Sequence, residues 1–137
     1  MTKTLMAALA VLVALATTAE ARKRNHIMYG EEYGRVVAHP SGCPYHAFCG
    51  CGVSVKIFGH PIRNLFLASN WFKFPRANPA PGMVAVRNHH VMAILSVDAN
   101  GNAVVYDPNS GGHQTRIHTR SLAGYRVVNP HRHLAYN

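Results

Sequence analysis

The first 21 residues limit how much of this chain can belong to a folded domain. An unbroken apolar run of 12 residues, 5–16, follows the positively charged Lys3. Because a helix needs about 20 apolar residues to cross a bilayer, this run is too short to span one. Its length suits a secretory signal, and Ala19-Glu20-Ala21 is a small-residue cleavage site. We therefore predict a cleaved signal peptide over residues 1–21 and an exported, periplasmic or secreted product. The alternatives are an N-terminal membrane anchor and a buried helix.

The rest of the chain is short and strongly basic. Cleavage after Ala21 leaves 116 of the 137 residues, which suits one small domain and which we expect to be a monomer. The whole chain has 14 Lys and Arg against 5 Asp and Glu, a net charge of +9. This charge favours an anionic partner, such as a cell-wall polymer, lipid head groups or nucleic acid, and does not choose among them. Nucleic acid is not expected, because no basic helix or groove motif stands out. The sequence contains no second long apolar run, so we expect no integral membrane segment after cleavage.

Glycine, proline and asparagine divide the chain into short elements, most of them of β type. We predict an extended lead-in over residues 22–41, one domain over 42–130 and a flexible tail over 131–137. Asn100-Gly101 predicts a hairpin turn, and the cluster 107–112 predicts a second turn. Apolar and β-branched runs predict strands at 35–38, 83–87, 90–97, 103–106, 115–118 and 125–128.

Two segments have a less regular pattern. In residues 49–58, two glycines lower the helix propensity and Val53, Val55 and Ile57 alternate, so the periodicity favours a strand. Residues 64–72 predict a short helix capped by Asn64. Trp71 and Phe72 in that helix are expected in the core, with a sugar-binding or base-binding surface as the alternative.

Three cysteines, Cys43, Cys49 and Cys51, lie within nine positions. An exported chain meets an oxidising compartment, so a disulfide is expected and one thiol is left over. His39 and His46 lie in the same stretch and suggest a zinc site as an alternative. Because Cys-x-Cys is not a usual zinc spacing and disulfide formation competes for the thiols, we expect no metal ion. Nothing in the sequence indicates a cofactor.

Candidate catalytic residues occur in the order Cys49, His90, Asn109. A cysteine hydrolase needs a nucleophilic sulfur, a histidine that moves its proton and a polar residue that orients the imidazole. Asp107 is the rival to Asn109 for the third role. The alternatives are that Cys49 forms a disulfide with Cys43 or is a free buried thiol, that His90 is a surface residue and that Asn109 is only a turn residue.

Several short motifs support this interpretation. They are Phe48-Cys49-Gly50, Leu67-Ala68-Ser69-Asn70-Trp71, Pro81-Gly82-Met83-Val84-Ala85-Val86 and His89-His90-Val91. Together they resemble small bacterial papain-like domains of the CHAP and NlpC/P60 type, over roughly residues 42–128. In that superfamily a cysteine opens a helix, and a histidine on a strand and an Asn or Asp complete the site.

The resemblance implies an α+β, papain-like fold in which an N-terminal helical half packs on an antiparallel sheet. It implies Cys49 as nucleophile, His90 as general base and Asn109 as orienting residue, and if so Cys43 and Cys51 are free to pair. The implied function is an exported cysteine hydrolase, an amidase or endopeptidase that cleaves amide bonds of cell-wall peptide. The resemblance thus implies peptidoglycan or another anionic envelope polymer as the partner. The alternative is a non-enzymatic exported module that binds an anionic envelope polymer. The remaining histidines, including His113 and His118, are expected to be mostly solvated.

Overall fold

The structure, a computed structural model, describes residues 34–132, and within this range the fold is α+β with a six-stranded antiparallel sheet. The predicted signal peptide, most of the lead-in and most of the tail lie outside the described residues. The described elements are β1 (Arg35–Val37), α2 (Cys49–Phe58), η1 (Arg63–Leu65), η2 (Ala68–Lys73), β2 (Val84–Arg87), β3 (His90–Val97), β4 (Asn102–Ser110), β5 (Gln114–Ser121) and β6 (Arg126–Val128).

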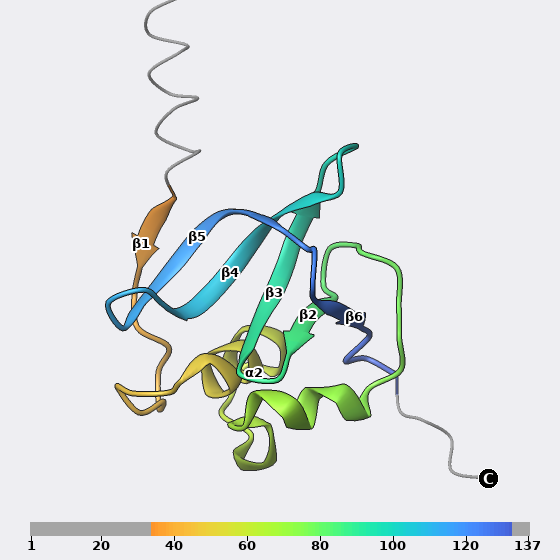
Figure 1. Ribbon diagram of the computed structural model, residues 1–137. Helices are drawn as coiled ribbons and strands as arrows, with labels where there is room; N and C mark the ends of the chain where they lie inside the picture. The colour runs from red at the N-terminus through yellow and green to blue at the C-terminus, as the bar shows by residue number, and fades with distance from the viewer. Residues whose placement is uncertain (1–33, 133–137) are drawn as a thin grey trace, which may run out of the picture. The chain divides into compact units, whose positions relative to one another are not determined.

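The strands follow the order β1-β5-β4-β3-β2-β6 across the sheet, and every neighbouring pair is antiparallel. Figure 1 shows β1 at one edge and β6 at the other, with α2 and the short helical turns gathered at the lower part of the sheet. No helix among residues 34–132 is long and apolar enough to cross a membrane.

The predicted strands at 35–38, 83–87, 90–97, 103–106, 115–118 and 125–128 are confirmed, as is the turn at Asn100-Gly101 between β3 and β4. One boundary is wrong. The cluster 107–112 was expected to be a turn, but β4 continues through Asp107 to Ser110 and the chain turns at 111–113. A register shift between Asp107 and Ser110 accommodates Pro108 inside the strand.

The strand that the periodicity favours over residues 49–58 is wrong, because these residues form the α-helix α2, which Cys49 opens as the family resemblance implies. Tertiary packing overrides their weak helix propensity. The first six residues of the helix are buried, while Val55 and Ile57 stay half-buried, so the alternation of valines did not mark a strand face. The expected helical half is not evident, since α2 is the only α-helix among the described residues.

The predicted helix over residues 64–72 is instead two 3₁₀ helices, and no side chain caps either of them. Trp71 is fully buried in the core, and its indole N–H donates a hydrogen bond to the Leu65 carbonyl at 2.8 Å. Phe72 is half-buried. The placement of Trp71 in the core is therefore confirmed.

The sheet has an apolar cluster on each face. On one face Val84, Val86 and Val91 pack against Val53 of α2 and against Trp71. The second cluster consists of Ala85, Met92, Ile94, Ala103 and Val105. Because side chains alternate along a strand, odd positions of β4 and even positions of β3 belong to this second face. His90 and Asp107 therefore share a face at the end of these strands.

Two glycines let α2 approach its neighbours closely. A Cβ atom at Gly50 would lie 2.1 Å from the Leu65 carbonyl oxygen and 2.3 Å from that of Phe66. A Cβ atom at Gly52 would lie 2.5 Å from the Pro108 Cβ. The glycines that argued against a helix are thus what allows the helix to pack beside the end of β4.

We predict that Gly50→Ala destabilises the protein, although alanine is the better helix former by up to about 1 kcal/mol. The new methyl group meets backbone oxygens that cannot rotate away, and overpacking of this kind costs about 1–3 kcal/mol. Urea unfolding measures the change. Lys56→Ala, an exposed position of the same helix, is the control and should change stability by less than about 0.5 kcal/mol. A Gly50→Ala protein as stable as this control would contradict the packing argument.

Candidate active site

Cys49 lies at the first position of α2, with 6% of its surface exposed. The preceding residue, Phe48, provides no side-chain cap. The first backbone N–H groups of a helix have no acceptor within the helix, so they point toward whatever lies at its N-terminus. They carry partial positive charge, which favours a negative charge at this point. The sulfur of Cys49 therefore lies beside a set of donors suited to an anion.

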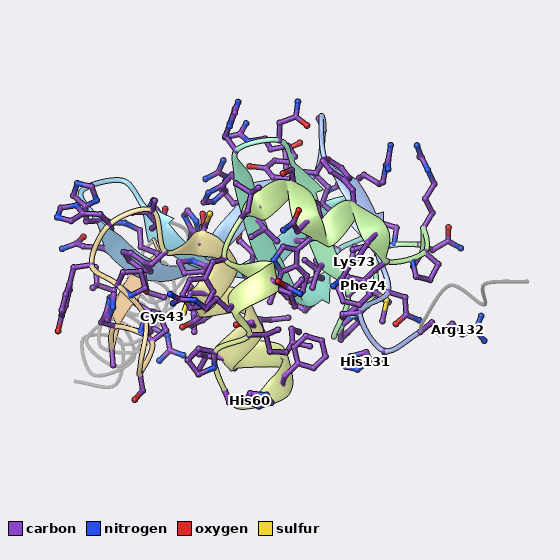
Figure 2. The ribbon with its side chains drawn as sticks, turned by 90° about the horizontal axis from the view of Figure 1, so that it is seen from below. Cys43, His60, Lys73, Phe74, His131 and Arg132 are labelled. Carbon is purple, nitrogen blue, oxygen red and sulfur yellow. A yellow bond between two sulfur atoms is a disulfide. The ribbon has the colours of Figure 1, made fainter. Side chains whose placement is uncertain are left out.

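The loop before Cys49 is held by a disulfide between Cys43 and Cys51. The His39 ring stacks on Tyr45, with centroids 4.4 Å apart, and packs edge-on against Phe48. Because the chain has three cysteines, this pairing leaves Cys49 as its free thiol. The alternative that Cys49 is a half-cystine is therefore excluded in this structure. In Figure 2, Cys43 lies on the opposite side of the view from Lys73 and Phe74.

His90 opens β3 and is bonded to Asp107 on the neighbouring β4. Its Nε2 lies 2.5 Å from Asp107 Oδ1, and 13% of the His90 side chain is exposed. Cys49 is a further neighbour of the imidazole and helps to raise the His90 pKa. Since Nε2 is engaged by Asp107, Nδ1 is the ring nitrogen that remains for the sulfur. The three side chains thus form a chain in the order Cys49, His90, Asp107.

The Asp107 carboxylate is completely buried and accepts hydrogen bonds from three cationic or ionisable side chains. His90 Nε2 donates to Oδ1, His118 Nε2 donates to Oδ2 at 2.7 Å, and Arg120 Nη1 donates to Oδ2 at 3.2 Å. Burial alone raises the pKa of Asp107, but the hydrogen bonds and charges of His90 and His118 outweigh burial and lower it. Asp107 is therefore a buried carboxylate that stays ionised.

The pKa of His90 is raised from 6.5 to about 9. Burial disfavours the charged imidazolium, yet hydrogen bonds to Asp107 and Cys49, and then their charges, favour it more strongly. His90 is thus protonated at neutral pH and donates to Asp107. An imidazolium next to a sulfur atom is the arrangement that stabilises a thiolate.

No hydrogen bond joins Asn109 to His90 in the structure. Its backbone is left-handed, with φ of 60°, and its side-chain oxygen lies 3.3 Å from His113 Nδ1. Asp107, the rival named from the sequence, is the residue that contacts His90. The sequence could not separate the two, because both were expected in one turn, whereas both lie in β4 and only its register decides which of them meets His90.

Two further residues of the cluster were missed. His118 was expected to be solvated, but 15% of its side chain is exposed and it bonds to Asp107. Arg120 lies two positions further along β5. The alternation of Arg116, His118 and Arg120 places them on one face of a strand. This period-2 pattern was the available signal, but only the pairing of β4 with β5 brings His118 and Arg120 to Asp107.

Three of the residues that suggested a zinc site have other partners in the structure. Cys43 and Cys51 are joined in the disulfide, and His39 Nε2 hydrogen-bonds the Cys43 carbonyl. In residues 34–132, no group of three or more His, Cys, Asp or Glu side chains is arranged to hold a metal ion.

No family model, no curated protein and no solved structure matches this chain. The resemblance to CHAP and NlpC/P60 domains stays a prediction.

We predict that His90 titrates near pH 9 and that Asp107→Asn lowers this midpoint. The substitution removes the strongest interactions of the imidazolium and leaves the unfavourable effect of burial. NMR of the imidazole C–H resonances measures the midpoint. Cys49→Ala, which keeps the Asp107 bond, should lower the midpoint by a smaller amount. Equal midpoints in all three proteins would contradict the assigned contacts.

The same pKa shifts predict how stability depends on pH. The pKa of His90 is higher in the folded protein than its ordinary 6.5, so its contribution is complete below pH 6.5 and is lost as pH rises through about 9. The lowered pKa of Asp107 makes its contribution present above pH 3.8 and lost as pH falls. Calorimetry should show Tm falling between pH 7 and pH 10, and falling less in His90→Gln. An equal fall in the two proteins would oppose the linkage to His90.

Proposed function

We propose that this protein is a cysteine-dependent amide hydrolase of the papain-like type. The observation that carries the proposal is the free thiol of Cys49 at a helix N-terminus, near enough to His90 to influence its pKa, while a buried carboxylate holds that imidazole. Nucleophile, proton carrier and orienting group are the three parts that covalent catalysis by cysteine requires. We assign these roles to Cys49, His90 and Asp107.

The reaction begins with the Cys49 proton on His90. The thiolate attacks the carbonyl carbon of the amide, and the oxygen becomes negatively charged. Backbone N–H groups at the start of α2 donate to this oxyanion. When the C–N bond breaks, the His90 imidazolium gives its proton to the departing amine. The product at this stage is a thioester on Cys49.

A water molecule then releases the acyl group. Neutral His90 takes a proton from water, the hydroxide attacks the thioester, and the sulfur leaves as a thiolate. A carboxylic acid departs, and the imidazolium beside the thiolate is restored. Asp107 keeps the imidazole oriented through both steps, and Arg120 and His118 keep the Asp107 carboxylate in place.

The substrate class we propose is cell-wall peptide, in a periplasmic or secreted setting. The resemblance to CHAP and NlpC/P60 domains suggests this substrate. The Cys43–Cys51 disulfide is compatible with an oxidising compartment. The net charge of +9 favours an anionic polymer as the surface on which the protein works.

The charge also supports a second candidate, a non-enzymatic module that binds an anionic envelope polymer. The two differ in what Cys49 does. In the binding module the thiol is a packed core residue, and its removal leaves the affinity for polymer unchanged. In the hydrolase the thiol reacts, and its reactivity depends on His90.

We predict that the oxidised protein cleaves soluble peptides from peptidoglycan, with new amines detected by mass spectrometry. Cys49→Ser should lower the rate by at least roughly 10³-fold, because oxygen is a far weaker nucleophile here. His90→Ala should lower it by about 10²–10⁴-fold. Asn109→Gly is the control: it removes the side chain, suits the left-handed backbone and should leave the rate close to wild type.

Iodoacetamide provides a readout that needs no substrate. The hydrolase predicts fast alkylation of Cys49 alone and a slower reaction in His90→Ala. A folded Cys49→Ser protein that cleaves as fast as wild type would overturn the proposal. If Cys49 is alkylated at the same rate in wild type and in His90→Ala, the binding module is favoured.

A further inference from the structure

The acidic side chains of the described chain are few, and both are already engaged. Asp107 is buried in the cluster above, and Asp98 accepts hydrogen bonds from the backbone of Asn100 and Asn102 in the β3–β4 turn. Among residues 34–132, every ion pair involves Asp107. Arginines elsewhere in this range therefore have no carboxylate partner within it.

Three of these arginines meet at one place. Arg76, Arg87 and Arg126 line a cavity of about 400 Å³ together with Phe72 and Tyr125. We name these five residues the arginine pocket. A second cavity of about 620 Å³ adjoins it and shares Arg76, Tyr125 and Arg126. Three like charges around one cavity repel each other, and a bound anion relieves that repulsion.

Aromatic rings hold two of the guanidinium groups in place. The Arg87 guanidinium lies over the Tyr125 ring, 4.9 Å from its centre, and that of Arg126 lies 4.7 Å from the centre of Phe72. A stacked guanidinium keeps its in-plane N–H groups free for another acceptor. The cations are thus positioned without a carboxylate, and their donors remain available.

Two polar atoms in the arginine pocket are also left without partners. Tyr125 Oη and Arg126 Nε are shielded from solvent and have no hydrogen bond to any described residue. Buried polar groups are almost always paired, and the described residues supply no acceptor for these two donors. A carboxylate has two acceptor oxygens in one plane and matches a guanidinium fork.

The arginine pocket adjoins the candidate active site. Arg87 pairs with His90 across the β2–β3 ladder, and residues directly opposite each other lie on the same face of a sheet. Tyr125 is close enough to the site for its pKa to respond to it: burial raises that pKa, Arg87 and Arg120 lower it, and Asp107 and Cys49 raise it. A ligand in the pocket therefore lies beside the reacting groups.

We propose that the arginine pocket binds a carboxylate of the substrate, so that the enzyme prefers peptides with an acidic side chain near the amide bond it cleaves. The proposal rests on the proposed hydrolase for its link to catalysis. The binding of the carboxylate itself does not depend on catalysis, because it uses Arg76, Arg87 and Arg126 and not Cys49.

The test measures binding to Cys49→Ala, which cannot turn over. Calorimetry compares N-acetyl-Ala-Glu-amide with N-acetyl-Ala-Gln-amide, which differ in one charge. We expect the glutamate peptide to bind about tenfold tighter or more, as one charge-assisted hydrogen bond implies. Adding Arg126→Gln, or separately Arg87→Gln, should remove most of the difference. Adding Arg35→Gln, which removes an exposed arginine from β1 at the opposite edge of the sheet, should keep it.

Equal affinity for the two peptides, or an equal loss in all three arginine variants, would overturn the proposal. Tighter binding of inorganic phosphate than of the glutamate peptide would overturn the assignment to a carboxylate. If the glutamate preference is present and wild type cleaves no peptide, the pocket stands and the hydrolase fails. If wild type cleaves both peptides at equal rates and the preference is absent, the hydrolase stands and the pocket fails.

Discussion

The buried carboxylate of Asp107 organises one end of the sheet. A carboxylate without exposure to water costs several kcal/mol unless partners compensate it, and removing a partner from such a group is strongly destabilising. Here β3 supplies His90, and β5 supplies His118 and Arg120. The charge on β4 therefore ties three adjacent strands together, and it also fixes the ring that faces Cys49. Stability and the orientation of His90 depend on the same group.

The position of the thiol depends on a second constraint, the close approach of α2. A side chain at Gly50 would overlap with the backbone oxygens of Leu65 and Phe66. A side chain at Gly52 would overlap with Pro108, the neighbour of Asp107. Ser54 adds a hydrogen bond from the amide of Ile62, and the disulfide joins Cys51 to the loop that precedes the helix. The helix is thus clamped at its first turns, where Cys49 lies. Without these close contacts the sulfur could not reach the imidazole of a strand on the sheet.

The sequence predicted the β-rich part well, because alternation and turn residues are local signals. It failed at α2, where glycines lower the propensity for a helix but serve packing against distant residues. It left Asn109 and Asp107 as rivals, since both follow an apolar strand. The choice depends on which residue faces His90 across the β3–β4 ladder, and no local pattern contains that register. His118 and Arg120 were missed for the same reason: they reach Asp107 from a third strand.

The excess of basic over acidic side chains among the described residues links these features. Asp107 neutralises cations on its own face, and Asp98 is used by a turn. Neither is available to Arg76, Arg87 or Arg126, which stack on rings or line a cavity instead. Within residues 34–132 the protein thus separates its cations into a satisfied set, which holds the candidate catalytic histidine, and an unsatisfied set next to it. A substrate with a carboxylate would pair with the arginines of the unsatisfied set, while its amide bond lies beside the histidine of the satisfied set. In that case substrate charge, and not only the fit of the scissile bond, would contribute to selectivity.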